Sequence, residues 1–266
     1  KITSFRLEFL KIAILCFILI LSLLSFMGII CSILWGFSEN WYFPNFFPND
    51  LNIENFLNFY YQNKSLILIS IFIPLMVSLL SISLIILWVE LLDYLNITKT
   101  QFEWIIFTPL FIPQISFLIG IQSFMIFFNF NSFLTPLIFV QLFYVIPYCF
   151  IILAPAMREV KTDYIKVASS LGKNRIVRLF KIKIPLVLPS LMTSFAIGMI
   201  VSFALYVPVY FIGAGRVTTL TVEALNLALS GSKQDLGIAT FFQILFPTLL
   251  LFTVAFINRK SVKWKI

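Results

Sequence analysis

The stretch DYIKVASSLGKNRIVRLFKIKIPLVLPS, residues 163–190, sets a dense run of basic residues between two long apolar segments. Apolar residues recur ahead of its glycine at three- and four-residue spacing: Val160, Tyr164, Val167, Ala168 and Leu171. This spacing predicts an amphipathic helix over residues 160–171. Gly172 follows where a helix commonly ends in the left-handed conformation, and Asn174 can N-cap a second helix. The sequence therefore predicts a helix–turn–helix, which we call the basic hairpin (residues 160–183).

The composition of the chain indicates a protein that crosses a membrane several times. Of its 266 residues, 61% are hydrophobic and 11% are charged, whereas soluble domains carry about 25% charged residues. Six uncharged runs reach the roughly 20 residues that a membrane-spanning helix needs: 12–35, 65–89, 104–128, 133–157, 184–212 and 236–257. We therefore expect an all-α membrane protein of six transmembrane helices. It forms one transmembrane domain over residues 1–266, with the basic hairpin between helices four and five.

Basic residues orient these helices, because Lys and Arg gather on the cytoplasmic side of membrane proteins. Residues 158–183 hold eight Lys or Arg against two acids, and both ends of the chain are basic as well. Residues 36–63, on the opposite side, contain three acids and no Lys or Arg. Residues 90–103 do not fit this orientation, because they place three acids and only one lysine on the side predicted to be cytoplasmic. Acids weigh little in this rule, so we predict that both termini lie in the cytoplasm.

The residue types that the chain lacks narrow its function. The six apolar runs hold no Asp, Glu, Lys or Arg, and the chain has no His, whereas ion-coupled transporters usually carry ionisable groups at membrane depth. The sequence SLGKN (170–174) lacks the upstream glycine and the Ser or Thr of a phosphate-binding loop. We expect no catalytic residue, no metal, no cofactor and no nucleic-acid partner. Any transport would then take its energy from another subunit.

The basic hairpin resembles the cytoplasmic signature loop of permease subunits of type I binding-protein-dependent ABC importers. That loop reads Glu-Ala-Ala, three residues, Gly, nine residues and Ile-x-Leu-Pro. Here KVA (166–168), SSL, Gly172 and IPLVLP (184–189) follow a similar layout. Lys166 stands where the family has glutamate and Val167 where it has the first alanine, while Ala168 and Gly172 match.

The family's loop forms a coupling helix that docks into an ATPase subunit. The resemblance therefore implies that part of the basic hairpin docks an ATPase here. The implied docking residues are Asp163, Lys166, Val167, Ala168, Ser169, Leu171, Gly172, Lys173 and Arg175. Lys166 reverses the charge of the family's glutamate, so a different contact is expected at that position.

The resemblance also implies partners, a location and a class of substrate. The chain would supply half of a translocation path in the inner membrane of a prokaryote. Its partners would be a second permease half, two cytoplasmic ATP-binding subunits, an external substrate-binding protein and membrane lipid. Residues 109–124 and 206–240 are similar to permeases of the thiamine, iron(III) and polyamine branch. The second stretch is also similar to thiamine-type permeases with two fused halves, which implies that this chain is the second half, in keeping with Lys1 in place of an initiator Met.

Two further sets of residues are candidates for contact with the transported solute or the binding protein. Polar groups inside the third and fifth spans are candidates for the path: Gln114, Gln122, Ser202, Tyr206 and Tyr210. A Gln within a span also commonly just bonds a neighbouring helix. The polar loop 213–235 offers candidates for an external contact, or is an ordinary solvated loop: Arg216, Thr218, Thr219, Thr221 and Glu223.

Two other functions stay open at this point. The first is a membrane scaffold or assembly factor whose basic hairpin binds a cytoplasmic protein without transport. The second is a secondary transporter, which the uncharged spans disfavour. Co-purification of an ATPase that an external binding protein stimulates would separate an ATP-driven importer from both.

Overall fold

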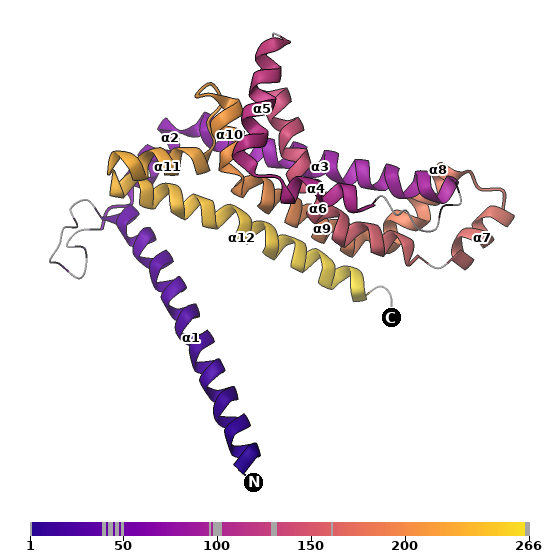
Figure 1. The fold of residues 1–266 in the computed structure, drawn as a ribbon, viewed down its shortest axis with the longest axis horizontal. Coiled ribbons are helices and arrows are strands. Elements are labelled where there is room, and N and C mark those ends of the chain that lie inside the picture. The colour runs from indigo at the N-terminus through magenta and orange to yellow at the C-terminus, as the bar shows by residue number, and fades with distance from the viewer. Residues whose placement is uncertain are drawn as a thin grey trace. The chain divides into compact units, whose positions relative to one another are not determined.

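Helices make up most of the chain in the computed structural model (Figure 1). The structure describes residues 2–38, 41, 45, 48, 51–95, 97, 103–128, 132–160 and 162–263, and only the backbone of 2–9, 162, 163, 165, 166 and 260–263. Five helices among the described residues are long and apolar enough to cross a bilayer, or six if one bent pair counts as a span. The predicted all-α membrane class is confirmed.

The helical elements of the described residues follow one another in chain order. Their bounds are α1 (Ile2–Phe37), α2 (Glu54–Gln62), α3 (Lys64–Tyr94), the 3₁₀ helix η1 (Glu103–Phe107), α4 (Thr108–Phe111), α5 (Gln114–Phe127), α6 (Leu134–Arg158), α7 (Thr162–Ser170), α8 (Arg175–Arg178), the π-helical turn η2 (Leu179–Lys183), α9 (Ile184–Ala204), α10 (Tyr206–Gly213), α11 (Leu220–Ser230) and α12 (Lys233–Lys263). The described residues divide into two compact units, Lys1–Asn63 with Ala224–Gln243, and Lys64–Glu223 with Ile244–Ile266.

The first unit holds α1, α2 and the first turns of α12. A Cβ atom on Gly237 would lie only 2.3 Å from the backbone N of Gly36, so the backbones of α1 and α12 meet at two glycines. The ring of Phe56, on α2, packs against those of Phe37 and Phe241, with centroids 4.3 and 5.3 Å away. Aromatic packing and small residues therefore hold this unit together.

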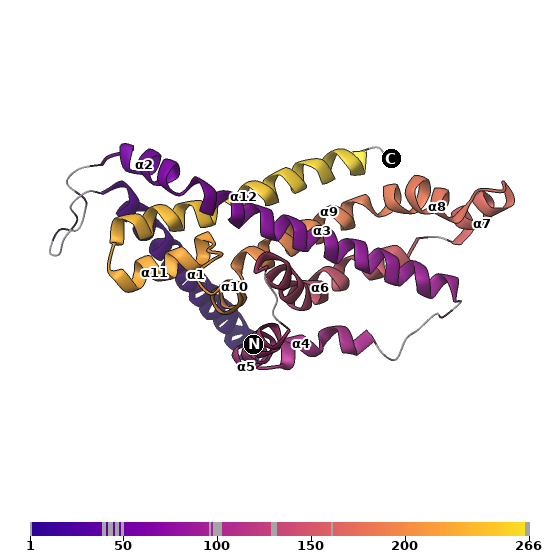
Figure 2. The same cartoon turned by 90° about the horizontal axis from the view of Figure 1, so that it is seen from above.

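In the second unit α3, α6 and α9 run side by side (Figures 1 and 2). Their buried side chains form the core, which includes Ile73, Val77, Ile85, Leu137, Val145, Leu153 and Val187. The helices approach most tightly at Gly198 of α9, where a Cβ would lie 2.8 Å from Cys149 Sγ and 3.2 Å from Ser78 Cβ. Small residues allow such close approach of helices in a membrane, where packing drives association.

Two of the predicted spans are interrupted. The run 104–128 bends by 98° between α4 and α5, where Ile112 is extended because Pro113 disfavours the helical conformation before it. The run 184–212 stops being helical at Leu205, whose φ and ψ are −75° and 89°. Pro208 has no N–H to bond the carbonyl four residues earlier, that of Ala204, which is the last residue of α9. Composition therefore placed these spans but did not show where their helices break.

Replacement of Gly198 by Ala tests the packing of the second unit. The added methyl group meets a buried sulfur and a neighbouring helix, and overpacking of this kind costs about 1–3 kcal/mol. We expect Gly198→Ala to lower the thermal unfolding temperature of the detergent-solubilised chain. Gly120→Ala is the matched control, because nothing lies within 4 Å of the added Cβ on α5. Equal stability of the two variants would contradict the packing described here.

Candidate functional site

The basic hairpin folds as two helices joined at a left-handed glycine. α7 ends at Ser170, and Gly172 has a φ of +69°, which glycine adopts without steric cost. The N–H of Lys173 donates to the carbonyl of Ala168 (3.1 Å), and that of Gly172 to the carbonyl of Ser169 (2.9 Å). This pair of bonds is a Schellman motif, which satisfies the last carbonyls of α7. The predicted helix and its glycine stop are confirmed.

The second arm of the hairpin differs from the prediction. Asn174 directly precedes α8, but its side chain makes no capping hydrogen bond among the described residues. The helix also does not end before the fifth span, since α8, η2 and α9 continue one another from Arg175 to Ala204. Pro185 follows the π-helical turn η2 and removes the N–H that the carbonyl of Lys181 would accept. One continuous helix therefore joins the hairpin to the helical core.

The two arms differ in what they expose. Val167 and Leu171 are 61% and 71% exposed although both are apolar, while Ala168 between them is buried. Ile176 and Phe180 are exposed on the second arm. Of the other implied docking residues, Ser169 and Lys173 are exposed and Arg175 is half-buried. The structure describes the backbones of Asp163 and Lys166 in α7, and their side chains lie outside the described part.

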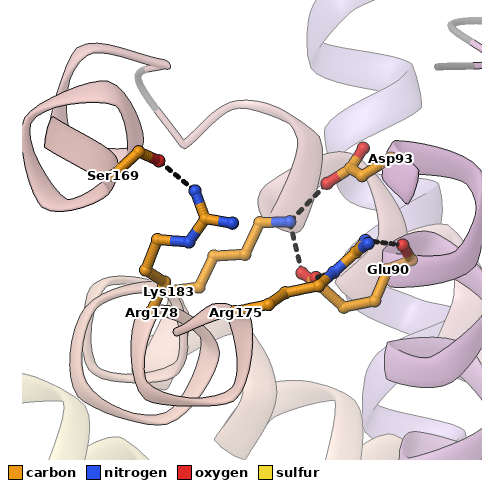
Figure 3. A network of polar contacts seen from close by, with 6 residues as sticks. All are labelled: Glu90, Asp93, Ser169, Arg175, Arg178 and Lys183. Atoms are coloured by element: carbon orange, nitrogen blue, oxygen red, sulfur yellow. Dashed lines mark hydrogen bonds and ion pairs between the residues drawn. The ribbon is translucent and has the colours of Figure 1, made fainter. Parts of the chain in front are cut away.

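Four charged side chains join the hairpin to the end of α3, and we call them the charge cluster: Glu90, Asp93, Arg175 and Lys183 (Figure 3). The Nζ of Lys183 donates to Glu90 Oε1 and to Asp93 Oδ2, both at 2.5 Å. Lys183 is 7% exposed at its side chain and Glu90 is 15% exposed. A buried ammonium placed between two carboxylates is therefore the centre of the cluster.

Arg175 reaches the same end of α3 in three ways. Its Nε donates to Glu90 Oε2 at 3.3 Å, and its Nη2 donates to the backbone carbonyl of Glu90. The guanidinium also lies over the ring of Tyr94, 5.0 Å from the centroid. A cation at a helix C-terminus complements the helix dipole, so both the carboxylate and the backbone of α3 favour this position.

A third base of the hairpin, Arg178, ties its two arms together. Nη1 of Arg178 donates to Ser169 Oγ, which links α8 to α7 across the glycine turn (Figure 3). Outside the charge cluster, Arg158 at the end of α6 pairs with Glu103 of η1, with nitrogen–oxygen distances of 2.5 and 3.2 Å. The three acids of residues 90–103 that opposed the predicted orientation each bond to a base of residues 158–183.

The path candidates do not form one continuous surface. Ser202 is buried, and its Oγ lies 2.5 Å from Gln141 Oε1 of α6. Tyr206 and Tyr210 are about half exposed, but they lie on α10, beyond the helix break at Leu205. A break in the helix therefore separates Ser202 from the other two candidates of the fifth span. Gln141 is a buried polar residue that spacing within one span could not reveal, because its partner is on another helix.

The third span carries the remaining path candidates. Gln114 and Gln122 are both half-buried on α5. The Nε2 of Gln114 is buried and has no hydrogen-bond partner among the described residues. Gln114 is the first residue of α5, directly after the bend at Pro113. An unsatisfied amide at a helix break is a candidate contact for a polar solute.

The candidate external loop is packed rather than simply solvated. Arg216 lies over the ring of Phe133, 4.3 Å from its centroid. Thr219 is buried, and its Oγ1 lies 2.9 Å from that of Thr221. Thr218 is half-buried, and the backbone N–H of Glu223 donates to the carbonyl of Thr219 at 2.9 Å. These contacts give the loop a defined shape.

One hydrogen bond ties this loop to α3. The backbone N–H of Leu220 donates to Ser70 Oγ at 2.7 Å, and Leu220 is fully buried. Ser70 lies near the start of α3, whereas the charge cluster lies at its end. α3 therefore contacts the loop and the basic hairpin at its two ends.

These features define a class of protein, a multi-pass membrane protein that presents a structured helical hairpin at the end of its helical core. The chain belongs to the family of binding-protein-dependent transport system inner membrane components, whose model matches residues 64–262. The match begins at the first residue of α3 and includes the whole basic hairpin. The predicted family resemblance and the inner-membrane location are thereby confirmed, while the branch within the family stays a prediction.

A curated relative supports the same assignment. The chain is 27% identical over 197 residues to the inner membrane ABC transporter permease protein YnjC of Escherichia coli (strain K12). The alignment covers 74% of this chain and 37% of that protein. The chain therefore spans little more than a third of the length of the curated relative that it matches.

Lys183→Met tests the energetic weight of the charge cluster. The change removes the shared ammonium and leaves Glu90 and Asp93 without it, and loss of one partner of a buried ion pair costs about 3–5 kcal/mol. We expect a clear fall in the thermal stability of the solubilised protein. Lys181→Met removes the same charge from an exposed side chain two residues away and should change stability little. Equal effects of the two changes would refute a structural role for the cluster.

Proposed function

We propose that this chain is a membrane-spanning subunit of an ATP-driven importer and forms half of the path that the solute takes. It works with a second permease half, two cytoplasmic ATP-binding subunits and an external substrate-binding protein. The chain itself is not an enzyme, and ATP is hydrolysed in the partner subunits. Membership of the binding-protein-dependent transport family supports this assignment.

The observation that carries the proposal is the form of the basic hairpin. Val167 and Leu171 expose apolar side chains at the end of the first arm, and the bonds around Gly172 fix the turn that follows. A loop that only touched lipid headgroups would need basic charge but no fixed glycine turn and no buried Ala168. Exposed apolar residues surrounded by polar ones are typical of protein–protein contacts. The ATP-binding subunit is therefore the partner we assign to this surface.

In this mechanism ATP binding closes the two ATPase subunits, and the hairpin docked on them moves with that closure. The hairpin passes this movement directly to α9, because α8, η2 and α9 are one helix. The helical core then changes from opening inward to opening outward. Substrate delivered from the external binding protein passes into the cytoplasm when the subunits reset. Both termini of the chain lie in the cytoplasm, as the positive charges predict.

The substrate is proposed to be a small solute of the thiamine, iron(III) or polyamine class. This part rests on the resemblance of residues 109–124 and 206–240 to that branch of the family. Polar groups along the path, Gln114, Gln122, Tyr206 and Tyr210, offer hydrogen bonds without fixed charge. The packed loop with Arg216, Thr218, Thr219, Thr221 and Glu223 is proposed to contact the external binding protein.

Leu171→Glu and Val167→Glu test the docking surface. A hot-spot residue contributes about 2 kcal/mol or more to binding, or roughly a 30-fold change in affinity. We therefore expect each variant to lose most of the ATP-binding subunit that co-purifies with the wild-type chain from cells that co-express both. Both side chains are exposed, so the chain itself should keep its expression and thermal stability.

Leu229→Glu is the matched control for this experiment. Leu229 is 80% exposed at the end of α11 and lies outside the hairpin. This variant should co-purify the same amount of ATP-binding subunit as the wild type. If the hairpin variants retained the subunit as well as Leu229→Glu does, the hairpin would not be the docking surface.

A further inference from the structure

We propose that Glu90 and Lys183, supported by Asp93 and Arg175, are positioning residues that make α3 move as one body with the basic hairpin. The proposal rests on the proposed function, since it concerns the movement that ATPase closure imposes on the hairpin. Chain continuity alone would carry that movement only to α9. The charge cluster extends it to α3, and through α3 to the opposite end of the second unit.

The charge cluster differs from a surface ion pair, because its central lysine is buried and bonds two carboxylates of α3. Lys183 is 7% exposed at its side chain and bonds two carboxylates of α3 at 2.5 Å each, while Arg175 adds a bond to the backbone of the same helix. Exposed ion pairs contribute little to stability, but removal of one member of a buried set leaves an uncompensated charge. Separation of α3 from the hairpin would leave Lys183 and Glu90 without their partners. We therefore expect the two elements to move together.

The contacts within the hairpin make it rigid enough to transmit a displacement. Arg178 bonds Ser169 across the turn, and the bonds around Gly172 fix the angle between α7 and α8. A movement of α7 therefore reaches Arg175 and Lys183, because no flexible loop between the two arms absorbs it. These two bases face the end of α3 in Figure 3, and Arg178 faces α7.

α3 then connects the cluster to the far end of the second unit. Ser70 and Glu90 are 20 residues apart on α3, or about 30 Å along a helix, which is the thickness of the hydrocarbon layer. Ser70 accepts the hydrogen bond from the backbone N–H of Leu220, where the packed loop passes into α11. The charge cluster and this loop are therefore attached to opposite ends of one helix, whose middle is buried at Ile73, Val77 and Ile85.

The sequence also favours a specific role over general charge balance. Acids on the cytoplasmic side contribute little to orientation, yet Glu90 and Asp93 lie three residues apart, so both face the same side of α3. Their partners Arg175 and Lys183 both lie on the continuous second arm. Both bases bond Glu90, and Lys183 also bonds Asp93.

Distance measurements by electron paramagnetic resonance test this inference in the complex of the chain with its co-expressed ATP-binding subunit. Spin labels are placed at Leu80 of α3 and Ile176 of α8, which are 44% and 68% exposed. Leu80 is ten residues from Glu90, or about 15 Å along α3. The exposed Cys16 and the half-buried Cys31 are replaced by Ala, and buried Cys149 is kept. Distances are compared without nucleotide and after trapping with ATP and vanadate.

The wild-type complex should give one narrow distance that is the same in both states. The variant Glu90→Gln with Lys183→Met removes both buried charges together, so no buried charge loses its partner, and the half-exposed Asp93 and Arg175 remain for water to solvate. In this variant the distance should shift or broaden on trapping. The control Glu159→Gln with Lys181→Met makes the same two changes at exposed positions and should behave as the wild type does.

Two outcomes would overturn the inference. One is a wild-type distance that changes on trapping, which needs no variant to observe, and the other is a double variant that keeps the wild-type distance in both states. In each of these the ATP-binding subunit still co-purifies, so the proposed function stands. Failure of that subunit to co-purify with the wild-type chain would instead remove the proposed function and the inference with it.

Discussion

A single lysine side chain, held between two carboxylates at the end of α3, fixes the place of the basic hairpin. Lys183 is almost fully buried where the continuous helix of the hairpin enters the helical core. A buried ammonium requires carboxylate partners, because its desolvation is otherwise far too costly. Glu90 and Asp93 of α3 meet this requirement, although they lie 93 and 90 residues before Lys183 in the sequence. Ion pairs therefore join the hairpin to α3, whereas the continuous backbone joins α8 to α9.

The same constraint explains the one segment that opposed the predicted orientation. Acids of residues 90–103 appear out of place when each loop is read alone. In three dimensions Glu90, Asp93 and Glu103 each bond to a base from residues 158–183. They are internal partners of the basic segment and add no negative patch to that face. Once these acids are counted together with the bases that they bond, residues 90–103 no longer oppose the predicted orientation.

Local signals in the sequence were enough for the all-α membrane class and for the first arm of the hairpin, because apolar length and a glycine stop act over a few residues. Pro113 and Pro208 mark the helix breaks, but a proline inside a membrane helix often only kinks it. The partners Glu90 with Lys183 and Gln141 with Ser202 could not be predicted, since each pair joins separate helices. Lys166, where the sequence departs from its family, has a described backbone in α7 and no described side chain.

The hairpin receives a displacement and the helices carry it across the membrane in the proposed mechanism. Its central claim is that an ATP-binding subunit occupies the hairpin surface around Leu171. A photo-reactive amino acid at position 171, irradiated in membranes that contain the co-expressed partners, tests this most directly. The predicted result is a covalent adduct with the ATP-binding subunit, identified by mass spectrometry. Adducts with lipid alone, or with proteins that bind no ATP, would contradict the account.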